Sequence, residues 1–244
     1  MNVRAHPTVR PYALALGVLP HRGLEGKLSF LSPSLAFDVA TALVLDTLGA
    51  LSTFPVRHRV VFSDGEDAVM RQIKLPATWR EHSLRGSTQG DRVANALSDL
   101  AGLGAEAMML VSADGPMLPL GQLFDGMMWL LPKNRVVLGP RAAGEGGRES
   151  GLYAIGSAEP LPYLSAIDGA LGLDGHVDDE LLPDVVGRVR AQAERAGSEL
   201  MTMPPSYQVD SREAFARFKI DVAGGLFAPH CRKLFERPEI AELG

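Results

Sequence analysis

Hydrophobic positions follow two alternating patterns along this chain. Short apolar runs bounded by Gly, Pro or Asp predict buried strands, and longer segments with apolar residues three and four apart predict amphipathic helices. The expected strands cover residues 12–19, 59–63, 108–111, 135–139, 151–156 and 199–203. The expected helices cover residues 35–51, 91–103, 120–131, 183–196 and 211–218.

This alternation of strands and helices is typical of βαβ units. It predicts an α/β fold with a mostly parallel central sheet. We find no internal repeat and no low-complexity tract. The pattern predicts a single domain over residues 1–220, followed by a weakly patterned C-terminal extension over residues 221–244.

Composition narrows the class of protein. Of the 244 residues, 46% are hydrophobic and 22% charged, which is ordinary for a globular chain. The net charge of −5 argues against nucleic acid as a partner. The single cysteine, Cys231, excludes an internal disulfide. No apolar run approaches the roughly 18 residues of a membrane span, so we expect no span and a cytoplasmic location.

The most informative residue is Asp114, which lies in the turn after the expected apolar strand at 108–111. Ligands of open α/β sheets bind at the carboxyl ends of the strands. A carboxylate placed there, next to Gly115, suits a divalent metal that carries nucleotide phosphates. The alternative is that Asp114 only caps the helix that begins near Leu120.

The loop after the first strand offers cations. Residues 20–27 contain neither a dinucleotide fingerprint nor a Walker loop, but they include Arg22 and Lys27. These two side chains could neutralise phosphates. The alternative is a solvated basic loop.

Several segments follow one another in a recognisable order. They are residues 20–31, 46–51, 89–94, 112–119, 136–140, 151–156 and 207–210. Together they resemble the bacterial glycosyltransferase-A-like proteins of the nucleotide-diphospho-sugar transferase superfamily, the group of arsenosugar-biosynthesis glycosyltransferases. The chain is more distantly similar to 2-phospho-lactate guanylyltransferase and to molybdenum-cofactor guanylyltransferase. The resemblance implies a three-layer α/β/α glycosyltransferase-A fold.

The resemblance also implies a catalytic group and a metal. In that family a Thr-Asp-x-Pro-x-Leu-Pro turn holds the ion, and Asp114 occupies this turn here. The late Tyr-Asp-Val-Asp turn is present as Tyr207-Gln-Val-Asp210, which makes Asp210 the second acidic ligand. We therefore expect Mg²⁺ or Mn²⁺ at Asp114 and Asp210, with Lys27 on the phosphates. Asp114→Asn is expected to abolish most turnover and to leave the fold intact.

The substrate-binding residues follow from the same resemblance. The base is expected over the end of the first strand and beside the start of the helix at Gln89. The expected nucleotide-binding residues are Leu16, Gly17, Pro20, Arg22, Gln89, Gly90 and Asp91. The alternative for Gln89 and Asp91 is a plain helix N-cap. The acceptor is expected against Glu149, Gly151 and Tyr207, under a glycine-rich loop at 144–151.

Two departures leave a second function open. Phe30 stands where the family has an arginine, and the loop before Gly151 lacks the family's aspartate. The predicted function is a metal-dependent transferase that uses a nucleotide or nucleotide-sugar donor and a small-molecule acceptor. The alternative is a non-catalytic relative that binds a nucleotide or a protein partner. The extension after residue 220 could dock on its own domain or form a homodimer.

Overall fold

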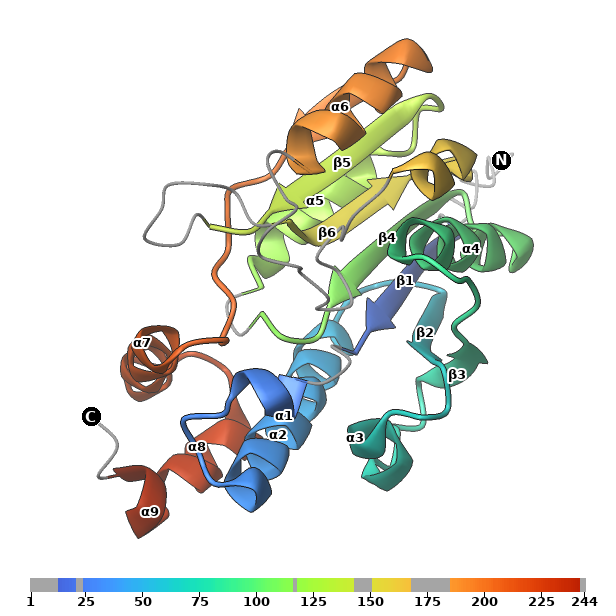
Figure 1. The fold of residues 1–244 in the computed structure, drawn as a ribbon. Helices are drawn as coiled ribbons and strands as arrows, with labels where there is room; N and C mark the ends of the chain where they lie inside the picture. The colour runs from blue at the N-terminus through green and yellow to red at the C-terminus, as the bar shows by residue number, and fades with distance from the viewer. Residues whose placement is uncertain (1–12, 21–23, 116–117, 143–150, 168–184, 242–244) are drawn as a thin grey trace, which may run out of the picture.

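The computed structural model describes residues 13–20, 24–115, 118–142, 151–167 and 185–241. Within them lies a seven-stranded sheet with the strand order β3-β2-β1-β4-β6-β5-β7 (Figure 1). The strands are β1 (Leu14–Leu19), β2 (His58–Ser63), β3 (Arg80–Ser83), β4 (Ala107–Ser112), β5 (Arg135–Pro140), β6 (Leu152–Ser157) and β7 (Glu199–Thr202). The central strands β1, β4 and β6 are buried along their whole length, as their apolar sequences require.

The sheet is mostly parallel, as predicted. β1 pairs in parallel with β2 and β4, and β5 pairs in parallel with β7. Among the described strands, β6 alone runs antiparallel, inserted between β4 and β5. This insertion separates the carboxyl ends of β4 and β5 by the width of one strand.

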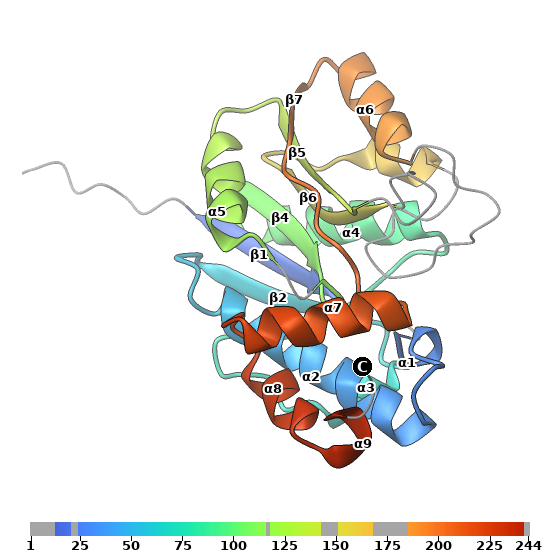
Figure 2. The ribbon, with the colours of Figure 1, turned by 90° about the vertical axis from the view of Figure 1, so that its left-hand side faces the viewer.

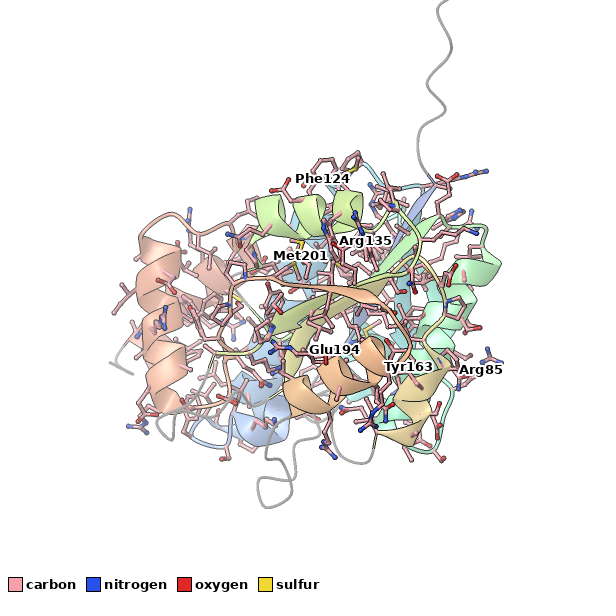
Figure 3. All side chains as sticks on the ribbon, turned by 90° about the horizontal axis from the view of Figure 1, so that it is seen from above. Arg85, Phe124, Arg135, Tyr163, Glu194 and Met201 are labelled. Atoms are coloured by element: carbon pink, nitrogen blue, oxygen red, sulfur yellow. The ribbon has the colours of Figure 1, made fainter. Side chains whose placement is uncertain are left out.

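Helices cover both faces of the sheet and complete three layers. The α-helices are α1 (Leu24–Lys27), α2 (Pro33–Leu51), α3 (Ala68–Gln72), α4 (Gln89–Gly102), α5 (Leu120–Trp129), α6 (Val185–Arg195), α7 (Arg212–Ala223), α8 (Pro229–Phe235) and α9 (Pro238–Ala241), with the 3₁₀-helix η1 at Pro162–Ala166. One core packs α2, α5 and α7 against the sheet, and the other packs α4, η1 and α6. Figure 3 shows Phe124 of α5 on one side of the sheet, and Glu194 of α6 with Tyr163 of η1 on the other.

The order of the strands fixes where a ligand can bind. The chain adds β2 and β3 on one side of β1 and then returns to place β4 on the other side. The crevice outside the carboxyl ends of β1 and β4 is therefore the topological switch point, where open α/β sheets bind ligands. The arrowhead of β1 points toward α1 and α7, which lie at this edge (Figure 1).

Helix α2 is apolar because it is buried in the core of the protein. It is long and apolar enough to span a bilayer by length and composition, with a mean hydropathy of 1.5. However, 61% of that window is buried inside the protein. Packing against the sheet accounts for its apolar residues, so the structure describes α2 as a core helix.

The C-terminal extension docks on its own chain through a buried carboxylate. Helices α7, α8 and α9 gather beside α1 and α2 (Figure 2). Asp46 of α2 accepts hydrogen bonds from the backbone N–H groups of His230 and Cys231, both at 2.9 Å. The N-cap of α8 is Ala228, which has no side-chain acceptor, so Asp46 satisfies amides that the helix itself leaves open. Helix α7 runs across residue 220, where sequence analysis placed the domain boundary.

We predict that Asp46→Ala loosens this extension. Two amides of α8 would lose a buried acceptor, which corresponds to about 1–3 kcal/mol of unfolding free energy. The melting temperature should fall by roughly 2–4 °C per kcal/mol. Asp38→Ala is the matched control, because Asp38 lies on the same helix and makes only an exposed ion pair with Arg237. Equal melting temperatures for the two variants would contradict this account.

Candidate functional site

Asp114 lies at the switch point but is sealed from solvent. Its exposure is 0%, and both of its carboxylate oxygens lie 3.0 Å from Nη2 of Arg141. The Ser112 hydroxyl donates to Oδ1, and the Gln208 amide donates to Oδ2. The N-cap of α5 is Pro119, so Asp114 does not cap that helix and the capping alternative is wrong.

Arg141 reaches Asp114 across the start of β6. It directly follows β5, and its Nε donates to the Leu152 carbonyl at 3.1 Å. Its own exposure is 1%, so the ion pair is buried on both sides. The backbone beyond β7 closes over the pair, because Ser206 bridges to Arg141 and Val209 donates to the Asp114 carbonyl. The pair thus joins the ends of β4 and β5 to the segment 206–209.

The donors around Asp114 do not fit a divalent metal. A carboxylate has about four acceptor positions. Ser112, Gln208 and the two contacts of Arg141 occupy them. An ion could enter only by displacing a donor or by lying next to a buried guanidinium. No group of three His, Cys, Asp or Glu side chains with metal-site geometry occurs among the described residues.

Asp210 lies within electrostatic reach of Asp114 and Lys27. Asp210 is an exposed residue, but desolvation of its carboxyl raises the pKa of that group. The charges of Lys27 and Arg141 lower that pKa, whereas the charge of Asp114 raises it. The predicted group of Asp114, Asp210 and Lys27 is therefore brought together, with Arg141 added. We call these four residues the charge cluster.

Two residues of the expected nucleotide site lie in the core, which corrects the prediction. Leu16 has 0% exposure. A Cβ on Gly17 would lie 2.4 Å from Cδ2 of Leu110 and 2.9 Å from Phe62. Gly17 therefore serves close packing inside the sheet. A base can approach only beyond these residues, at the end of β1.

The start of α4 is also occupied by the protein itself. Thr88 is the N-cap and forms a capping box with Asp91, so the capping alternative is confirmed for Asp91, whereas Gln89 is the first residue of the helix. A Cβ on Gly90 would lie 2.1 Å from the Leu164 carbonyl oxygen, so this glycine lets η1 pack on the helix. Gln89 is buried at 7% exposure. Gly90 and Asp91 were expected to bind a nucleotide, but both have structural roles at the start of α4.

Pro20, a buried residue of the expected set, borders a hollow in the surface. It lines a small hollow of about 20 Å³ at the ends of β1 and β2. Its other lining residues are Phe62, Ser63, Asp64, Asp67, Met70, Leu84 and Arg92. This hollow flanks the switch point on the β2 side.

Gly151 and Tyr207, the described residues of the expected acceptor site, adjoin the charge cluster. Gly151 has φ +121°, a backbone conformation that favours glycine, and its carbonyl accepts from the Arg141 N–H at 2.9 Å. The Tyr207 hydroxyl donates to Asp221 of α7, and Arg217 lies 4.3 Å from the ring centre. Tyr207 therefore ties α7 to the segment 206–209. Burial raises the pKa of Tyr207, and the Asp221 contact adds to this rise.

Three of the sequence predictions cannot be placed. Arg22, Glu149 and the loop before Gly151 lie outside the described residues. Phe30, which replaces the family's arginine, is described and lies 5.6 Å, centre to centre, from the Phe215 ring of α7. Phe30 therefore packs on α7 and supplies no positive charge for a phosphate.

Three members of the site were not predicted from the sequence. Arg141, Ser112 and Gln208 make the contacts that seal Asp114. Ser112 and Arg141 had a detectable signal, since each lies at the end of a predicted strand. Gln208 occupies the turn where the resembled family has an aspartate, so its change from acid to amide was visible but its partner was not.

Comparisons with solved structures identify the fold. A protein from Desulfovibrio desulfuricans G20, provisionally named a nucleotide-diphospho-sugar transferase, matches with a TM-score of 0.70 and 16% identity over 94% of this chain and 93% of its own. A 4-diphosphocytidyl-2C-methyl-D-erythritol synthase matches with a TM-score of 0.54 and 16% identity, over 87% and 99% of the two chains. Rv0371c from Mycobacterium tuberculosis H37Rv matches at 0.52 and 14%, over 86% and 98%.

The chain has the fold of the nucleotide-diphospho-sugar transferases. The expected three-layer α/β/α glycosyltransferase-A architecture is thereby confirmed. No protein-family model and no curated protein sequence matches the chain. Roles for individual residues consequently rest on the geometry described above.

We predict that Asp114→Asn destabilises the protein, in contrast to the expectation from sequence. Neutralising one partner leaves the Arg141 guanidinium buried without its counter-charge, which typically costs about 3–5 kcal/mol. Unfolding in urea near neutral pH measures the effect.

Asp210→Asn is the matched control for that measurement. The raised pKa of Asp210 means that folding disfavours its ionised form, so its contribution is favourable at low pH and is lost as the pH rises through the folded-state pKa. Near neutral pH the amide should leave the unfolding free energy unchanged or raise it. A loss below about 1 kcal/mol for Asp114→Asn would show that the Asp114–Arg141 pair is not closed in solution.

Proposed function

We propose that this chain takes a nucleotide or nucleotide sugar as donor and transfers its nucleotidyl or glycosyl group to a small-molecule acceptor. The observation that carries the proposal is the charge cluster, which lies where β1 and β4 end, at the switch point of the sheet. The names of the structural neighbours, a nucleotide-diphospho-sugar transferase and a diphosphocytidyl-methylerythritol synthase, support it.

The chemistry requires positive charge beside the phosphates. Nucleotidyl transfer releases pyrophosphate, and glycosyl transfer releases a nucleoside phosphate, so the leaving group gains negative charge in both reactions. Lys27, the last residue of α1, is half-buried and close enough to Asp210 to shift its pKa. In this proposal the Lys27 ammonium binds the phosphates and stabilises that developing charge.

The base would lie over the hollow beside Pro20, which is too small to enclose it. That hollow continues the switch point toward β2 and combines apolar walls, from Phe62 and Met70, with polar groups from Ser63 and Asp64. Apolar walls with a few polar groups are typical of small-molecule sites. A wider hollow of about 560 Å³ lies between α2 and helices α8 and α9, but the charge cluster does not contribute to it.

A second candidate function is nucleotide binding without turnover. Two observations favour it: Phe30 packs on Phe215 in place of a phosphate-binding arginine, and Asp114 is fully engaged within the protein. Both candidates place the nucleotide at the same strand ends. They differ in whether a donor is consumed when an acceptor is present.

We predict that a nucleotide stabilises the protein and that Lys27 contributes to its binding. A ligand at 100 times its Kd adds about 2.7 kcal/mol, or roughly 5–10 °C in Tm for a chain of this size. The measurement is a thermal-shift panel of CTP, UTP, GTP and ATP and their diphospho-sugars. Lys27→Ala should raise the Kd about tenfold or more, because hydrogen bonds to charged groups contribute about 1.5–3 kcal/mol.

The control for this variant is Lys133→Ala, which removes an exposed lysine just before β5, at the opposite edge of the sheet. It should leave the Kd unchanged. The absence of any shift across the panel would refute nucleotide binding. A shift without donor consumption, tested across a set of acceptor sugars, alcohols and phosphate esters, would favour the non-catalytic function.

A further inference from the structure

A cation of the protein itself, Arg141, lies at Asp114, where the family resemblance implies a metal. Nη2 of Arg141 lies 3.0 Å from each oxygen of Asp114. It also donates to the Ser112 hydroxyl at 3.2 Å, and that hydroxyl in turn donates to Asp114. Arg141 thus makes the bidentate approach to a carboxylate that a divalent ion would make.

The surrounding contacts hold this arrangement in place. The Nε of Arg141 donates a hydrogen bond to the Leu152 carbonyl, and its backbone N–H donates one to the Gly151 carbonyl. Gln208 fills the remaining position on Asp114 with an amide, which is a donor and cannot serve as an anionic ligand. Replacing Arg141 by an ion would require these contacts to break and would leave a permanently charged side chain without its partner.

We infer that the Arg141 guanidinium replaces the divalent metal beside Asp114, so that this chain binds nucleotide phosphates without a metal ion. The inference rests on the proposed nucleotide site. Arg141 is buried, so it acts as a positioning residue and does not touch the phosphates. It neutralises Asp114, and Lys27 makes the contact with the phosphates. The two cations together supply the double positive charge that a metal would bring, and Asp210 lies within electrostatic reach of both.

The test compares binding with and without metal. The affinities of the wild-type protein for CTP, UTP, GTP and ATP are measured by calorimetry, in EDTA and in Mn²⁺. The inference predicts that the best of these ligands binds in EDTA with a Kd within about threefold of its value in Mn²⁺. A Kd that is about tenfold or more lower in Mn²⁺ overturns the inference and leaves the proposed function standing. Absence of binding in both conditions overturns the proposed function and the inference with it.

Removing the charge of Arg141 tests whether a metal ion can take its place. Arg141→Met keeps an unbranched stem and removes the charge, which opens Asp114 to an ion. Its affinity in EDTA should fall about tenfold or more, and Mn²⁺ should restore it. A residue with only a structural role would show the loss without the rescue by metal. Loss that Mn²⁺ does not restore in a folded variant therefore contradicts the inference.

Two further variants guard against misfolding. Arg135→Met removes an arginine from the other end of β5, where it pairs with Glu199 and stacks on Trp129, and it should keep wild-type affinity in EDTA. Arg141→Lys keeps the positive charge and should keep metal-free binding even where Arg141→Met does not fold. A lysine variant that folds and binds nucleotide only with Mn²⁺ would contradict the inference.

Discussion

The buried ion pair between Asp114 and Arg141 organises the carboxyl edge of the sheet. It connects the end of β4 to the end of β5 across the inserted strand β6, and Gln208 adds the segment after β7. Burying two charges is unfavourable unless their remaining hydrogen-bonding positions are filled. Here Ser112 and Gln208 donate to Asp114, and the Leu152 carbonyl accepts from Nε of Arg141. The pair therefore specifies one arrangement of strand ends rather than simply adding stability.

That arrangement determines what the edge can offer a ligand. The switch point between β1 and β4 places any bound group above a neutralised carboxylate, beside Lys27 and Asp210. On the other side, Phe30 and Tyr207 connect this edge to α7, so the C-terminal helices form one side of the site. Asp46 in turn anchors α8 on α2. The C-terminal extension is thus coupled to the site through packing.

The fold could be predicted from sequence because its central elements carry strong local patterns. β1 and β4 are continuous apolar runs, and α4 has a capping box at its start, so their positions were expected to within a few residues. β3 was missed because it is a short edge strand of mostly exposed polar residues. Helix α8 was missed because the carboxylate that caps it comes from Asp46, far away in the chain.

The site was less accessible to sequence reasoning for a related reason. The cluster of Lys27, Asp114 and Asp210 was expected, because each residue follows a recognisable motif. The role of Arg141 depends on β6 running antiparallel between β4 and β5, and no local pattern reports the order of strands. Gly17 and Gly90 were assigned to a ligand because sequence alone does not separate a glycine needed for close packing from one needed for a phosphate.

A ¹H–¹⁵N NMR titration of the wild-type protein with the best-binding nucleotide in EDTA locates the bound ligand. We expect the shifted amides to cluster at the ends of β1 and β4, including Lys27, Ala113 and Gly115, with the strongest effects beside the charge cluster. Shifts confined to the hollow between α2 and α8, at Thr41, His230 and Lys233, would contradict this expectation.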